Sequence, residues 1–134
     1  MKSLEVGILI LRVYLGFAFF MHGLAKFQGG VENTAGWFDS IGIPGFTAYI
    51  IAFVELIGGL SLIVGFGTRY ISALFFIIMI VATFKVKLSS GFMGNSQGSG
   101  FELDLAYAVM SLLLVFYPTS TLSLDAKVGK RKER

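Results

Sequence analysis

The stretch LEVGILILRVYLGFAFFMHGLA, residues 4–25, decides the fold class of this chain. A helix needs about 20 predominantly apolar residues to cross the hydrocarbon core of a bilayer, and this run has that length. It exceeds the apolar core of a secretory signal peptide, which has about 7–15 residues, and Arg12 lies in its middle. We therefore interpret it as a first membrane span and not as a cleaved leader.

Three further apolar runs follow, at residues 46–66, 69–87 and 103–118. The last is the shortest, and Pro118 would end it because proline lacks a backbone N–H. Charged residues make up only 14% of the chain, against about 25% in soluble domains, which indicates lipid as the solvent. The sequence predicts an all-α membrane protein. Its fold would be an antiparallel up-down-up-down four-helix bundle, in a single domain over residues 1–134 with a basic tail from residue 119.

The connections between these runs differ in character. The first, residues 27–45, includes a stretch from Val31 to Ile43 that would form a short amphipathic helix at the membrane interface, anchored by Trp37 and Phe38. The second is only Gly67-Thr68, which predicts a tight antiparallel hairpin. The third, residues 89–100, is polar and rich in glycine, which is typical of a flexible exposed loop.

The Lys and Arg residues predict the orientation, because cytoplasmic loops carry an excess of them. With the N-terminus inside, Lys2, Arg69 and five tail residues are cytoplasmic, whereas three lysines lie at the outer boundary. The tail residues are Lys127, Lys130, Arg131, Lys132 and Arg134, and the outer lysines are Lys26, Lys85 and Lys87. This count favours both termini in the cytoplasm. Beside apolar spans, the basic tail indicates the inner side of a membrane and not nucleic-acid binding.

Two charged residues lie deep inside the predicted spans, where charge is costly and usually faces the interior of the bundle. At about 1.5 Å per residue, Arg12 lies roughly 12 Å from the cytoplasmic end of its span and Glu55 roughly 15 Å from the same side. The matching depths predict an ion pair between Arg12 and Glu55. The pair would serve either as a structural staple or in function, and both interpretations stay open.

A second polar group would lie near the outer boundary. Besides the three lysines it contains His22, Glu102, Asp104 and Tyr107. In the simpler interpretation the lysines reach up to head groups and the acids sit at a helix N-terminus, where negative charge is favourable. Four glycines would let the first two spans approach closely: Gly16, Gly23, Gly58 and Gly59.

The sequence offers few residues for metal or thiol chemistry. The chain has no Cys, which excludes thiol redox chemistry, disulfides and thiolate metal sites. His22 is the only histidine, and a metal site usually needs three or four ligands. A haem bound through His22 would need a second ligand that is not histidine, or a second chain.

The same residues carry a family resemblance, in a fixed order along the chain. The motifs are Arg12-Val-Tyr-Leu-Gly16, Phe20-Met-His22-Gly23-Leu-Ala-Lys26, Glu55-Leu-Ile-Gly58-Gly59, Gly65-Phe-Gly67-Thr68-Arg69 and Glu102-Leu-Asp104-Leu-Ala-Tyr107. This ordered set, over residues 4–118, resembles the DoxX family, and most closely its bacillus-type members associated with catechol and quinone stress. The resemblance implies a four-helix protein of the bacterial inner membrane and an oxidoreductase, or a subunit of one.

The first functional hypothesis is a membrane oxidoreductase acting on quinones or catechols. Arg12, Glu55 and His22 would form its catalytic group. Substrate would be bound by Tyr107, Asp104, Lys26 and Glu102. His22 or Tyr107 would hydrogen-bond a quinone oxygen, and Asp104 or Glu102 would relay protons. The chain carries no evident electron carrier, so a flavin, a haem or a soluble dioxygenase or reductase partner would be required.

Two alternatives stay open beside it. The protein would be a non-enzymatic anchor or assembly factor that recruits a soluble redox enzyme through its basic tail and glycine-rich loop. Otherwise it would be a small transporter for aromatic compounds, for which four spans are few, so that a homo-oligomer would be required.

Overall fold

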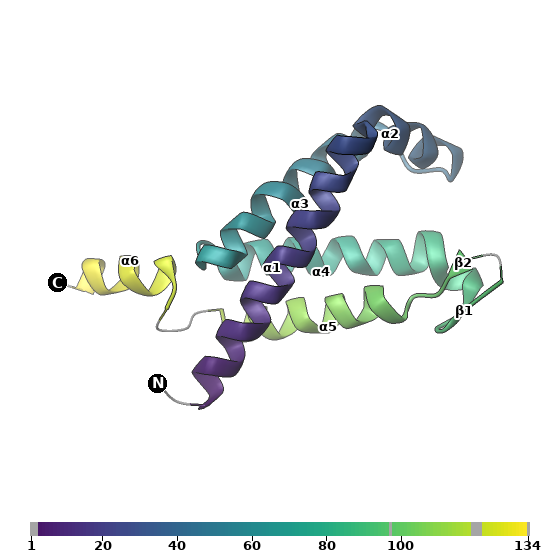
Figure 1. Cartoon of the computed structure of the whole chain (residues 1–134). Coiled ribbons are helices and arrows are strands. Elements are labelled where there is room, and N and C mark those ends of the chain that lie inside the picture. The colour runs from purple at the N-terminus through teal and green to yellow at the C-terminus, as the bar shows by residue number, and fades with distance from the viewer. Residues whose placement is uncertain (1–2, 97, 119–121, 134) are drawn as a thin grey trace.

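The computed structural model describes residues 3–96, 98–118 and 122–133 (Figure 1). Its main helices are α1 (Ser3–Gly29), α2 (Val31–Ser40), α3 (Phe46–Val64), α4 (Thr68–Ala82), α5 (Glu102–Phe116) and α6 (Leu124–Glu133). Helix α4 continues into a π turn, η1 (Thr83–Lys87), and a 3₁₀ turn, η2 (Leu88–Ser90). Two short antiparallel strands, β1 (Gly94–Asn95) and β2 (Gly98–Ser99), precede α5. Lys2 and Arg134, used above for the orientation, and the first tail residues 119–121 lie outside the described residues.

Three helices of the described chain are long and apolar enough to cross a membrane: Ser3–Gly29, Phe46–Val64 and Thr68–Ser90. These confirm three of the four predicted spans. Helix α5 has 15 residues, so it is about 22 Å long, against about 30 Å for a hydrocarbon core. The all-α class is confirmed, with α5 as a shorter helix.

Helices α1 and α3 form a closely packed antiparallel pair. A Cβ atom added to Gly16 would lie 2.6 Å from the carbonyl oxygen of Gly59, and one added to Gly23 would lie 2.6 Å from the backbone nitrogen of Leu56. Small residues at these three positions therefore let the two backbones meet, as predicted. Gly58 faces α4 and not α1, because a Cβ added to it would lie 2.9 Å from the ring of Phe75 on α4.

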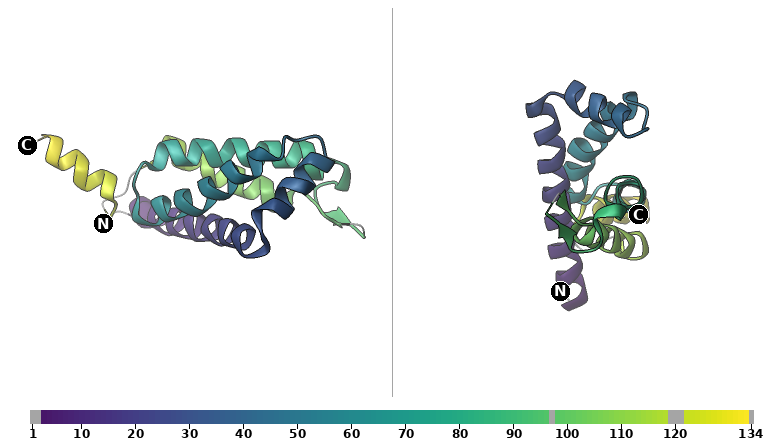
Figure 2. Two further views of the ribbon diagram at one scale, coloured as in Figure 1. Left: turned by 90° about the horizontal axis from the view of Figure 1, so that it is seen from above. Right: turned by 90° about the vertical axis from the view of Figure 1, so that its right-hand side faces the viewer.

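Helices α4 and α5 form the second pair, and the two pairs diverge. Figure 1 shows them close together near the α3–α4 turn and spreading apart toward α2 and the β1–β2 hairpin. They are joined where Phe19 of α1 stacks on Phe75 of α4, with ring centroids 3.8 Å apart. Tyr107 of α5 lies against the same ring of Phe19, at 5.6 Å. The end-on view in Figure 2 shows α2 and the adjoining ends of α1 and α3 standing apart from α4 and α5.

The connections refine the sequence predictions. Gly65 and Gly67 both adopt positive φ, at 77° and 62°, which lets the chain turn sharply between α3 and α4 and confirms the tight hairpin. Helix α2 confirms the helix predicted after Val31. Phe38, however, is buried against Val31 and Ala48 instead of being an exposed anchor, whereas Trp37 is half exposed. Residues 89–100 are more regular than predicted, because they hold the β1–β2 hairpin.

Candidate functional site

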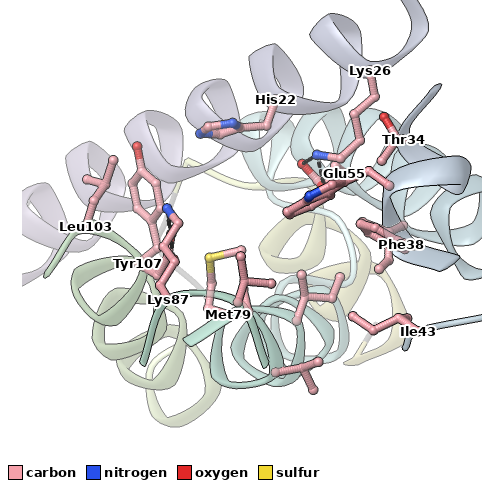
Figure 3. Close-up of a pocket in the computed structure, with 17 residues that line it drawn as sticks. His22, Lys26, Thr34, Phe38, Ile43, Glu55, Met79, Lys87, Leu103 and Tyr107 are labelled. Carbon is pink, nitrogen blue, oxygen red and sulfur yellow. Dashed lines mark hydrogen bonds and ion pairs between the residues drawn. The ribbon is translucent and has the colours of Figure 1, made fainter. Parts of the chain in front are cut away.

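A cavity of about 270 Å³ lies between the two helix pairs (Figure 3). Its walls come from six elements: α1, α2, α3, α4, η1 and α5. Most of the lining is apolar or aromatic, including Trp37, Phe38, Ile78 and Met79. The polar lining consists of His22, Lys26, Thr34, Glu55, Lys87, Asp104 and Tyr107. An apolar chamber with few converging polar groups is the usual form of a small-molecule site.

One wall carries a buried ion pair between α1 and α3. The Nζ atom of Lys26 lies 2.9 Å from Oε1 of Glu55 and 3.1 Å from Oε2. Glu55 is only 3% exposed, so its charge depends on this partner. Lys26 lies in the last turn of α1, where the helix dipole also favours a cation. Figure 3 shows the pair beside Thr34 and Phe38 of α2.

The predicted pair between Arg12 and Glu55 is wrong. Arg12 is buried, and its Nη2 atom donates to the carbonyl oxygens of Leu122, at 2.8 Å, and Ile63, at 3.5 Å. A Cβ on Gly65 would lie 2.9 Å from the guanidinium carbon, so Arg12 is level with the end of α3. Glu55 lies about 15 Å back along that helix. The depth estimate failed because it assumed that the start of α1 is level with the end of α3, whereas α1, with 27 residues against 19, extends past that end.

The opposite wall carries a second ion pair, between η1 and α5. The Nζ atom of Lys87 lies 3.1 Å from Oδ2 of Asp104 and 3.4 Å from Oδ1. A π turn holds one residue more than an α turn, so η1 changes the face of the helix on which Lys87 emerges. Thr83 begins this turn, and its hydroxyl donates to the carbonyl oxygen of Met79 at 2.9 Å. Such π turns occur often at functional sites.

Two further predicted residues face the cavity between these pairs. The imidazole of His22 and the ring of Tyr107 meet edge to face, with centroids 6.1 Å apart. Figure 3 shows the hydroxyl of Tyr107 directed toward α1, with Lys87 close beside it. Tyr107 is largely buried and His22 is exposed, so the phenol is the more enclosed of the two groups.

The structure brings together five of the predicted site residues: His22, Lys26, Glu55, Asp104 and Tyr107. Arg12 lies far from them, as described above. Glu102 also lies apart, because it lines a separate hollow of about 260 Å³ together with Phe92 and Met93. Lys85 is exposed.

The predicted site residues did not include Lys87, Trp37, Phe38 or Met79, which also line the cavity. Met79 follows Phe75 by one helical turn, and this spacing could have placed it on the inward face. Lys87 could not be placed in this way, because an uninterrupted α-helix predicts a different face for it. Among the described residues, no group of three or more His, Asp or Glu side chains could hold a metal ion.

Comparisons with known proteins identify the family. The DoxX family model matches residues 7–88. Over 98% of this chain and 94% of the relative, the sequence is 45% identical to a Bacillus subtilis protein named "Putative oxidoreductase CatD". It is 34% identical to the inner membrane protein YqjF of Escherichia coli, over 79% of this chain and 87% of that protein. An uncharacterized membrane protein of Mycobacterium tuberculosis is 28% identical over 93% of this chain and 83% of its own length.

No solved structure matches the chain. The relatives named as membrane proteins agree with the three helices that are long and apolar enough to cross a membrane. The chain is a multi-pass membrane protein and belongs to the DoxX family.

Proposed function

We propose that this protein is a membrane oxidoreductase, or the membrane subunit of one, that binds a quinone or catechol in the cavity between its helix pairs. One observation carries the proposal: two ion pairs with buried carboxylates, Lys26–Glu55 and Lys87–Asp104, face a single apolar cavity. The volume of about 270 Å³ suits a compact ring compound, since drug-sized pockets begin at about 300 Å³. The name of the Bacillus subtilis relative, "Putative oxidoreductase CatD", supports the same class of reaction.

The polar groups fit the two oxygens of such a ring. Reduction of a quinone to a quinol adds two electrons and two protons, and each carbonyl oxygen becomes a hydroxyl. Lys26 on one wall and Lys87 or Tyr107 on the other would donate hydrogen bonds to those oxygens and supply protons. Glu55 and Asp104 would hold the lysines in place and accept protons in the reverse direction. Trp37 and Phe38 would pack against the ring.

The electrons must come from another molecule. A haem bound by His22 does not fit, because the cavity beside it holds only about 270 Å³ and the ring of Tyr107 stands 6.1 Å from the imidazole. We therefore propose a flavin- or haem-containing partner, or a soluble dioxygenase or reductase, as the source or consumer of electrons. In this arrangement the chain supplies substrate binding, exclusion of water and proton transfer.

The membrane placement extends the proposal. Helix α5 would be the fourth, short span of a single domain over residues 1–134, in the inner membrane of a bacterium, with both termini in the cytoplasm. The name of YqjF and the distribution of Lys and Arg support this placement. The cavity would then lie toward the outer face.

Trp37 gives a direct test, because it is the only tryptophan and lines the cavity. Duroquinone, whose ring is fully substituted and cannot arylate lysines, would quench its fluorescence in the purified protein. We expect saturable quenching, which Glu55→Gln weakens and Glu102→Gln leaves unchanged because Glu102 does not line the cavity. Quenching that rises linearly without saturation would overturn the proposed binding. Equal quinone reduction by membranes with and without the protein would overturn the redox role.

The same preparation separates the remaining alternatives. A protein that binds no ring compound but co-purifies in fixed ratio with a soluble redox enzyme would be an anchor. Uptake of aromatic compounds by reconstituted vesicles, with a dimer in detergent, would indicate a transporter. Absorption and lipid-extract mass spectra of the purified protein would reveal a bound quinone or a coloured partner.

A further inference from the structure

The C-terminal segment is fastened to the bundle at the end opposite the cavity. The carboxylate of Asp125 accepts hydrogen bonds from the backbone N–H groups of Gly67, at 2.9 Å, and Thr68, at 3.1 Å. The N–H group of Asp125 donates in turn to the carbonyl oxygen of Gly65 at 3.0 Å. Asp125 thus caps the N-terminus of α4 and fixes the first turn of α6 against the α3–α4 turn.

A second set of contacts fastens the residues just before α6. Buried Arg12 donates to the carbonyl oxygen of Leu122, and Ser123 is itself buried. A side chain on Gly65 would collide with Ser123, so this glycine makes room for the segment. The residues just before α6 are therefore held at the end of the α1–α3 pair where Arg12 and Gly65 lie.

This end of the bundle has the character of a membrane boundary. Phe66, Tyr70, Phe116 and Tyr117, at the ends of α3, α4 and α5, are all exposed. Aromatic rings at the ends of apolar helices are typical of the head-group region. Arg69 is also exposed here, and its Nε atom donates to the carbonyl oxygen of Val115 at 3.0 Å. The start of α6 is thus fixed at the level where head groups lie.

The charge of α6 points to its partner. Asp125 is used in the cap, and the residues after it carry five cations and one acid. The cations are Lys127, Lys130, Arg131, Lys132 and Arg134, and the acid is Glu133. Leu124 and Val128 are four residues apart on one face and both exposed, so the first turns of α6 present an apolar patch. In Figure 2 α6 leaves the bundle beyond the α3–α4 turn.

We propose that α6 is a surface anchor whose cations bind the head groups of anionic phospholipids in the leaflet where Asp125 holds it. Helix α6 spans about 15 Å, and its first turn, which contains Lys127, is held at the level of the head groups by Asp125. An anionic membrane surface attracts clusters of Lys and Arg that lie beside the bilayer. A lipid surface is favoured over a soluble protein because the hydrogen bonds of Asp125 to Gly67 and Thr68 fix the start of α6 at the membrane boundary. The proposal does not depend on the redox function.

The test uses the absence of native cysteine. Val128→Cys places a single thiol on α6 of the full-length protein, and a polarity-sensitive fluorophore is attached there. The protein is reconstituted in vesicles of phosphatidylcholine alone or with added phosphatidylglycerol. We expect a blue shift of the emission and quenching by brominated lipid only with phosphatidylglycerol. Both should reverse at about 0.5 M salt, where the Debye length falls to roughly 4 Å.

Charge variants make the test specific. Replacing Lys130, Arg131 and Lys132 together by Gln should abolish the lipid response, whereas Lys85→Gln, at the cavity end of the molecule, should leave it intact. The same emission in neutral and anionic vesicles would overturn the proposal. So would a response that survives the triple replacement, or a probe that shifts only when a soluble protein fraction is added.

Discussion

Lys26 and the buried carboxylate of Glu55 form an ion pair one helical turn beyond the level at which His22 faces the cavity. The pair joins α1 to α3 at the end where the two helix pairs diverge. Its position makes it both a contact between helices and part of the cavity wall. Stability and ligand binding should therefore respond to changes at either residue.

Breaking the pair on one side should cost more than removing both charges. Lys26→Met leaves the carboxylate of Glu55 buried without its partner, which we expect to destabilise the protein by about 3–5 kcal/mol. Lys26→Met with Glu55→Leu leaves no charge and should recover most of that loss. Thermal unfolding in detergent measures both. Additive losses in the double variant would show that the two side chains do not interact.

Arg12 should matter for the C-terminal segment and not for ligand binding. Arg12→Lys keeps the charge but loses the planar group that reaches the carbonyl oxygens of Leu122 and Ile63. We expect faster tryptic cleavage in α6 and unchanged quenching of Trp37 by duroquinone. Arg69→Lys, which also changes an arginine bonded to a backbone carbonyl, is the matched control and should leave the cleavage rate unchanged. Loss of duroquinone binding in Arg12→Lys would restore the catalytic role first predicted for it.

The close approach of α1 and α3 depends on Gly59. In Gly59→Ala the new methyl group would lie 2.5 Å from the backbone nitrogen of Phe20, so the helices must separate. Overpacking of this kind costs about 1–3 kcal/mol, which should appear as a lower Tm. Gly7→Ala is the matched control, because nothing lies within 4 Å of its added Cβ. Its Tm should stay the same or rise, since alanine favours a helix over glycine by roughly 1 kcal/mol.

The phenol of Tyr107 should contribute to binding through its hydroxyl. Tyr107→Phe keeps the ring that packs on Phe19 and removes only the hydrogen-bonding group. A net hydrogen bond is worth about 0.5–1.5 kcal/mol, so the Kd for duroquinone should rise by roughly twofold to tenfold. Tyr70→Phe, at the exposed opposite end, is the control and should have no effect. Equal Kd values for wild type and Tyr107→Phe would remove the hydroxyl from the site.

Much of this fold could be predicted from the apolar runs. Their lengths predicted α1, α3, and α4 together with its continuation through η1. Gly65 and Gly67 predicted the turn between α3 and α4. The glycines on α1 and α3 predicted which faces meet, because little else lets helices approach closely in lipid.

The site was harder to predict, for reasons of register. Arg12 and Glu55 seemed level only because the unequal lengths of α1 and α3 cannot be aligned from composition alone. Lys87 was missed because a π turn leaves no clear sequence mark. Phe38 was assigned to the surface because an aromatic residue beside Trp37 looks like an anchor, whereas the fold covers it with α3.

Neither ion pair crosses the cavity. Lys26–Glu55 lies within the α1–α3 pair, and Lys87–Asp104 joins η1 to α5 in the other pair. The two helix pairs contact each other instead through aromatic side chains, which include the stacked rings of Phe19 and Phe75 and the ring of Tyr107 against Phe19. Each helix pair thus contains its own ion pair, and the contact between the two helix pairs is mainly aromatic. Rotation of one helix pair against the other would break neither ion pair, so the width of the cavity depends on the contacts between the helix pairs and not on these charges.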